Sequence, residues 1–108
     1  GVANRAVLAA LAAMEAHVET PLDGAALARA AGLGRRQLER LFRLHLGETM
    51  GARYRAIRLA RARVLLRETS LGLPEIAAAS GFVSAGHFSR AFRDRFGLPP
   101  GRYRRAAA

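Results

Sequence analysis

The chain has 108 residues and a formal net charge of +10 at pH 7, a length that suits one small domain. It contains no cysteine, which excludes disulfide bonds, thiolate zinc sites and thiol nucleophiles and is compatible with the cytoplasmic location we expect. The three histidines, His17, His45 and His87, form no metal-spaced pair. No apolar run approaches the ~20 residues that span a bilayer. The sequence therefore predicts no enzyme, catalytic residue, metal site, cofactor or membrane partner.

Arginine carries all of the basic charge. None of the 18 basic residues is lysine, and with so much alanine the simplest cause is GC-rich coding. Guanidinium groups nevertheless bind phosphates and guanine edges in a bidentate way, whatever the cause of their abundance. The charge indicates a polyanionic partner and by itself leaves DNA, RNA and an anionic membrane surface open.

Apolar periodicity and capping residues predict an all-α fold of about seven helices. The first carries an apolar stripe of Val7, Leu8, Leu11 and Met14. In the fourth, apolar residues fall on two sides, as expected of a connector that packs against two subdomains. We expect its six arginines to divide between DNA phosphate contacts and solubility. The expected helices span about 4–18, 24–31, 35–46, 50–68, 73–80 and 85–96, with a short seventh after Pro99-Pro100.

One unit occurs twice along the chain, and each copy is typical of a helix–turn–helix. Gly32 corresponds to Gly81 at a shift of 49, and residues 38–51 correspond to residues 88–101 at a shift of 50. The second copy therefore has one extra residue in its turn. We predict a single DNA-binding domain over 1–108, with a first subdomain at 3–48, a connector helix at 49–68 and a second subdomain at 69–105.

The third and sixth helices are expected to have an apolar face and an opposite, mainly basic face. A helix of this kind, preceded by a short helix and a glycine turn, has the form that enters the major groove. The expected inward residues are Leu38, Leu41, Phe42, Phe88, Ala91, Phe92 and Phe96. The expected base-reading residues are Arg36, Glu39 and Arg40 in the first copy and Ala85, Gly86, His87, Ser89 and Arg90 in the second. The expected phosphate contacts are Arg35, Arg43, Ser84 and Arg93.

Each residue type has its own chemistry at a base edge. Arginine can fork onto guanine O6 and N7, and Glu39 can accept from a cytosine amino group. For Glu39 an ion pair with an arginine one turn away is an equal alternative. His87 and Ser89 can donate to bases or phosphates, although His87 can equally face solvent. Ala85 and Gly86 favour close approach of the helix or contact with a thymine methyl.

The second copy resembles the DNA-binding domain of the AraC/XylS family of bacterial transcription regulators. The resemblance covers about residues 7–104, and its most specific part is an ordered match over some 26 residues. It implies two helix–turn–helix motifs joined by a long helix, whose recognition helices enter adjacent major-groove segments of a promoter. The matching segments are Glu75-Ile76-Ala77, Ser80-Gly81-Phe82-Val83-Ser84, His87-Phe88-Ser89-Arg90-Ala91-Phe92-Arg93 and Phe96-Gly97-Leu98-Pro99-Pro100.

Residues 14–22 and 34–42 are similar to one branch of that family. In that branch the DNA-binding domain follows an N-terminal domain similar to class I glutamine amidotransferases and DJ-1/PfpI proteins, which senses metabolites. The resemblance therefore implies that this chain is a C-terminal piece and that a small-molecule effector acts only through the missing domain. Contact with RNA polymerase is compatible with DNA binding and would be an added function.

Three positions depart from the family pattern. Gly34 and Gly72 stand where a capping serine is usual, and Thr49-Met50 replaces the usual Ser/Thr-Pro after the glycine that ends the third helix. The second recognition helix begins with the small pair Ala85-Gly86, which lowers the direct base contacts expected of it.

We expect sequence-specific binding of double-stranded DNA as a transcription regulator; the sequence does not decide between activation and repression. The alternative is a nonspecific nucleic-acid or polyanion-binding module. Sequence-specific RNA modules normally stack bases on exposed aromatic side chains, whereas the seven aromatic residues here are mostly assigned to the core.

Overall fold

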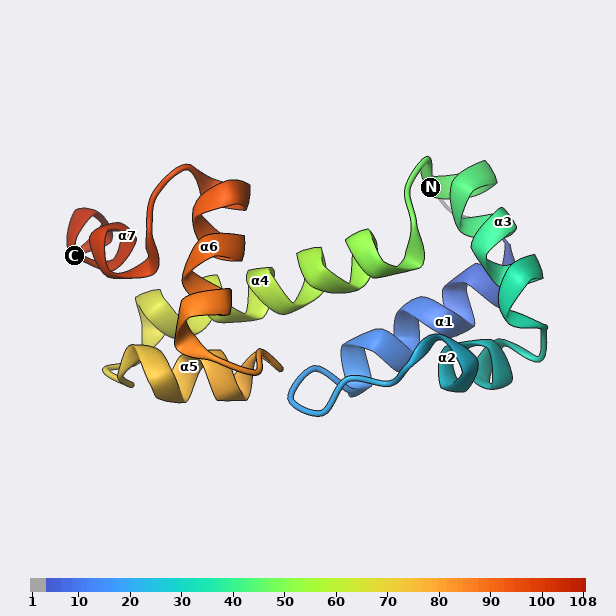
Figure 1. Cartoon of the computed structure of the whole chain (residues 1–108), viewed down its shortest axis with the longest axis horizontal. Helices are drawn as coiled ribbons and strands as arrows, with labels where there is room; N and C mark the ends of the chain where they lie inside the picture. The colour runs from blue at the N-terminus through green and yellow to red at the C-terminus, as the bar shows by residue number, and fades with distance from the viewer. Residues whose placement is uncertain (1–3) are drawn as a thin grey trace. The chain divides into compact units, whose positions relative to one another are not determined.

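The computed structural model describes residues 4–108, and this part of the chain folds into seven α-helices without a strand. The all-α prediction is confirmed; the expected start of the first subdomain, at residue 3, lies outside the described residues. Figure 1 labels the helices. They are α1 (Arg5–Ala16), α2 (Gly24–Ala31), α3 (Arg35–Leu46), α4 (Met50–Glu68), α5 (Leu73–Ala79), α6 (Ala85–Phe96) and α7 (Pro100–Ala107).

The chain divides into two compact units, Gly1–Arg55 and Ala56–Ala108. The boundary falls inside α4, so each unit holds one end of that helix. In the first unit, Met50 and Tyr54 of α4 are buried. In the second, Leu59, Ala62 and Leu66 of α4 are buried. Each end of α4 thus contributes buried side chains to a different unit.

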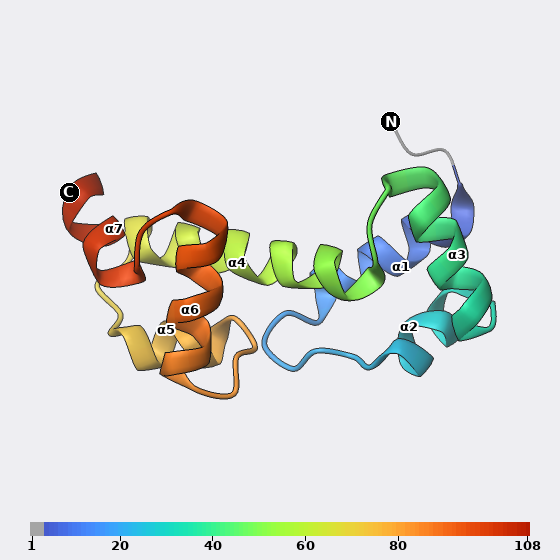
Figure 2. The ribbon, with the colours of Figure 1, turned by 45° about the horizontal axis from the view of Figure 1, so that its top comes forward.

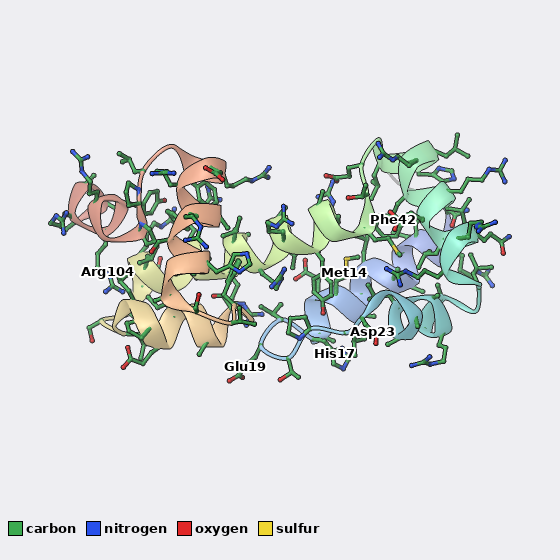
Figure 3. The ribbon with its side chains drawn as sticks, in the orientation of Figure 1. Met14, His17, Glu19, Asp23, Phe42 and Arg104 are labelled. Atoms are coloured by element: carbon green, nitrogen blue, oxygen red, sulfur yellow. The ribbon has the colours of Figure 1, made fainter. Side chains whose placement is uncertain are left out.

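The first unit packs α1 and α3 around a small apolar core. Asn4 caps α1 by accepting a hydrogen bond from Val7 N at 3.0 Å, and Asp23 caps α2 by accepting from Ala26 N at 2.8 Å. Met14 of α1 and Phe42 of α3 are fully buried and point into this core (Figure 3). Leu8, expected in the core, is 47% exposed, and Ala10 takes its place among the buried residues of α1.

The second unit has an aromatic core built on the C-terminal part of α4. Figure 2 shows α5, α6 and α7 gathered around this part of the helix. Phe88 and Phe92 of α6 are fully buried, with ring centroids 5.8 Å apart. Tyr103 of α7 meets Phe92 edge-on at 5.3 Å. Edge-to-face pairs of this kind stabilise a core beyond the area that they bury.

The duplication extends to the burial of individual residues. From Leu38 to Met50 the order of buried, half-buried and exposed positions is identical to that from Phe88 to Pro100. The helix before each motif also repeats, because Val7, Ala10 and Met14 have the same spacing as the buried residues 59, 62 and 66 of α4. Each unit is therefore a three-helix helix–turn–helix closed by the first turns of a further helix, α4 in one and α7 in the other.

Equivalent side chains close the two units. The Tyr54 hydroxyl donates to the backbone carbonyl of His17 and accepts from Leu22 N at 3.0 Å, which fixes the loop between α1 and α2. Fifty residues later Arg104, labelled in Figure 3, donates to Leu66 O at 3.1 Å and Thr69 O at 3.3 Å at the end of α4. A cation is favourable there because the last carbonyls of a helix carry partial negative charge.

Candidate nucleic-acid interface

The recognition helix of the first unit, α3, follows a left-handed glycine. Gly32 has φ +71°, a conformation that a residue with a Cβ adopts only at a cost, and it turns the chain from α2 toward α3. Gly34 precedes α3 without a side-chain cap. The first backbone N–H groups of α3 therefore lack a capping side chain, and their partial positive charge suits an anion such as a DNA phosphate.

The recognition helix of the second unit, α6, begins at a better-fixed turn. Ser84 Oγ accepts from His87 N at 3.1 Å, which caps the helix. Gly81 has φ +81°, and its carbonyl accepts from Arg58 Nη1 at 3.0 Å. The Arg58 guanidinium also lies 4.8 Å from the centroid of the Phe82 ring. Because Arg58 belongs to α4, this arginine ties the turn to the helix that supports it.

Most of the expected DNA-contacting residues lie on the surface. The expected core positions Leu38, Phe42, Phe88 and Phe92 are fully buried, so each recognition helix directs its opposite side outward. The expected contact residues that are exposed are Arg35, Arg36, Arg40, Arg43, Ser84, Ala85, Gly86, His87, Arg90 and Arg93. In each unit, therefore, the exposed side of the recognition helix carries arginine at both equivalent pairs of positions, 40/90 and 43/93.

The remaining two expected base-reading residues, Glu39 and Ser89, are half-buried. Glu39 Oε1 accepts a hydrogen bond from Met50 N at 2.8 Å, so this carboxylate contacts the first residue of α4. The alternative ion pair with an arginine one turn away on α3 is not formed among the described residues. The contact with Met50 spans 11 residues, and no local pattern in the sequence indicated it.

Arg35 lies across the start of α2. A Cβ built on Gly24 would be 2.5 Å from Arg35 Nε and 2.9 Å from its Cζ. Glycine at residue 24 therefore leaves room for the Arg35 side chain, which is exposed and lies beside the capped N-terminus of α2.

Three of the six α4 arginines have roles inside the protein that the sequence did not reveal. Arg53 pairs with Glu48, Arg58 holds the turn before α6, and the Arg63 guanidinium lies 4.9 Å from the centroid of the Phe96 ring. Arg55, Arg61 and Arg67 are exposed. The expected division of these arginines between phosphate contact and solubility therefore has to include a third, structural group.

The residue inserted into the second turn is Val83, whose side chain is 90% exposed.

All seven aromatic side chains of the chain are buried or half-buried. Within residues 4–108, therefore, no aromatic side chain is fully exposed, whereas modules that bind single strands stack bases on exposed aromatic side chains. Among the described residues no helix is long and apolar enough to cross a membrane, and no group of acidic, histidine or cysteine side chains is arranged to hold a metal ion.

Comparison with known proteins agrees with this geometry. A family described as a helix-turn-helix domain matches residues 27–106. A solved structure of an AraC-type transcriptional regulator from Chromobacterium violaceum superimposes with a TM-score of 0.91 at 41% identity, covering 95% of this chain and 92% of that one. The chain belongs to the AraC-type helix-turn-helix family. The resemblance inferred from the sequence is thereby confirmed.

Other AraC-type relatives are full-length regulators. The HTH-type transcriptional regulator GlxA of Rhizobium meliloti is 50% identical over 105 residues, which are 97% of this chain and 32% of that protein. CdhR of Pseudomonas aeruginosa is 45% identical over 100 residues, 93% of this chain and 30% of that protein. This AraC-type domain thus spans about a third of the length of these curated relatives.

A further solved structure is the DNA-binding domain of AdpA in complex with a target DNA. It superimposes with a TM-score of 0.88 at 27% identity and covers 95% of this chain and 93% of that one. Together with the family assignment, this likeness supports DNA binding and transcriptional regulation as the general function of this AraC-type domain.

Proposed function

We propose that this AraC-type domain binds double-stranded DNA in a sequence-specific way by inserting α3 and α6 into adjacent major-groove segments of a promoter. The observation that carries the proposal is the repeated surface of the two units. Each recognition helix buries its apolar side and leaves arginines at equivalent positions exposed. A basic helix after a glycine turn fits the dimensions of the major groove.

The contact residues divide into two groups in this proposal. Base edges are read by Arg36 and Arg40 in the first unit and by Ala85, Gly86, His87, Ser89 and Arg90 in the second. Phosphates are held by Arg35, Arg43, Ser84, Arg93 and the helix N-termini. Arginine supports both roles, because its planar fork matches guanine in the groove and phosphate on the backbone.

The whole protein has further proposed partners. Because AraC-type relatives are transcriptional regulators about three times as long as this chain, we assign small-molecule control to a domain that this chain does not contain. Contact with RNA polymerase belongs to the same proposal.

Fluorescence anisotropy on a selected duplex and on its shuffled counterpart tests the proposal. Specific binding predicts a preference for the selected duplex of at least about 1,000-fold at fixed salt. With roughly 6–10 phosphate contacts, log K should fall with log salt at about −0.9 per contact. Equal affinity for both duplexes at every salt concentration would reject sequence-specific reading and leave the nonspecific polyanion binder.

A further inference from the structure

The two units begin their closing helices in chemically different ways. In α4 the N-cap Thr49 accepts from Ala52 N at 3.0 Å, and Glu39 Oε1 accepts from Met50 N at 2.8 Å. Two of the backbone donors that every helix start leaves without an intrahelical partner are thus satisfied by side chains. An ionised carboxylate is a strong acceptor for such a donor and is also favoured by the helix dipole.

The equivalent start of α7 has fewer donors to satisfy. Its N-cap and first residue are Pro99 and Pro100, neither of which has a backbone N–H. Ser89 corresponds to Glu39 at a shift of 50 residues, and within residues 4–108 its hydroxyl makes no hydrogen bond. The residue at this equivalent position is therefore a hydrogen-bond acceptor in the unit where the N–H exists, and a short side chain in the unit where proline has removed it.

We infer that Glu39 is a positioning residue, which fixes the start of α4 to the recognition helix α3, and that base reading at this register belongs to its counterpart Ser89. Met50 is 3% exposed, so its N–H would be left without a partner in a poorly hydrated place if the carboxylate turned away toward DNA. A buried donor without a partner costs more free energy than an average hydrogen bond contributes. The bond to Met50 therefore competes directly with a bond to a base.

The stability part of the inference needs no DNA. Glu39→Ala should raise the unfolding equilibrium constant of the first unit at least about tenfold, because a charge-assisted bond is lost at a buried donor. In the Met50→Pro background the same substitution should change that constant by less than about threefold, since no N–H remains to be satisfied. Equal effects in the two backgrounds would overturn the inference.

Amide exchange provides a second readout that does not depend on the proline variant folding. The Met50 amide should exchange at least about tenfold faster in Glu39→Ala. Glu39→Gln should restore most of the protection, because its amide oxygen can still accept the bond. Unchanged Met50 exchange in Glu39→Ala would show that the carboxylate does not hold this donor and would reject the positioning role.

Ser89→Ala is the matched control variant at the equivalent position. On duplexes selected by the unmodified protein, Glu39→Ala should keep the base preference at every position, whereas Ser89→Ala should lose a preference at one base pair without changing amide exchange in either unit. A base preference lost only in Glu39→Ala would overturn the inference. This arm rests on the proposed function; if the unmodified protein selects no duplex, that function fails while the two stability measurements still decide the role of Glu39.

Discussion

Arg40 and Arg93 are both exposed, and we expect them to serve different purposes at the DNA. Arg40 lies in the middle of α3, whereas Arg93 lies in the last turn of α6. Arg40→Ala should cost about 1–3 kcal/mol of binding free energy and relax the preference at one base position, because a bidentate contact to a base edge is lost. Arg93→Ala should weaken binding to all sequences alike. Affinities measured on duplexes with single base changes test this; equal loss on specific and random duplexes for Arg40→Ala would reject its reading role.

Ser80 is the one buried polar residue within the described part of the second unit, and its Oγ has no hydrogen-bond partner there. The equivalent residue of the first unit is Ala31. Ser80→Ala should therefore raise the free energy of unfolding of the second unit by about 1 kcal/mol, because an unsatisfied hydroxyl is removed from the core. Urea denaturation followed by signals of the second unit measures the change. A decrease of similar size would show that the hydroxyl is satisfied in the folded protein.

At the scale of the helices, the side chains that tie a closing helix to a loop determine how firmly each unit holds together. Tyr54→Phe removes the hydroxyl group that donates to His17 O and accepts from Leu22 N. The Tyr54 side chain is only 6% exposed. The free energy of opening of the first unit should fall by about 1–3 kcal/mol. Amide exchange in α1 and α2 would detect the change.

Arg104→Met is the corresponding variant of the second unit, because it removes the bonds to Leu66 O and Thr69 O at the end of α4. It should speed amide exchange around the end of α4 and leave α1 and α2 unaffected. Loss of protection in the first unit would contradict the independent closure of the two units.

Local patterns predicted the helices well because the determinants of a helix lie close together in sequence. Asn4, Asp23 and Ser84 cap helices whose N-terminal ends the sequence predicted at or next to these residues. The face of each recognition helix followed from the 3.6-residue period, with Leu38 and Phe42 buried as expected. In α1 the same reasoning erred at Leu8, because residues 6–14 are all apolar and the direction of the stripe is therefore ambiguous.

Contacts between distant residues were beyond the reach of these patterns. The bond from Met50 N to Glu39 spans 11 residues, that from Arg58 to Gly81 O spans 23, and that from Arg104 to Leu66 O spans 38. An arginine in the sequence has the same chemistry whether it binds DNA or its own backbone. Only its surroundings in the fold separate the structural arginines of α4 from those left exposed.

At the scale of the whole molecule, the two units share one packing arrangement but carry different side chains on the exposed side of α3 and α6. Burial repeats residue by residue from Leu38–Met50 to Phe88–Pro100, whereas the exposed side chains differ, with Arg36 against Gly86. The core is thus constrained by packing while the outward residues are free to set specificity. We expect Arg36 to give the first unit a hydrogen-bonded base contact that Gly86, which has no side chain, cannot make in the second.

In-vitro selection of duplexes from a random pool tests the central claim most directly. If both recognition helices enter successive major-groove segments, the selected DNA should contain two different half-sites whose centres lie about 10 bp apart. Arg40→Ala should remove the preference in one half-site, and Arg90→Ala should remove it in the other. Selection that returns no preferred sequence, or a single site altered by both substitutions at the same base pair, would contradict the account.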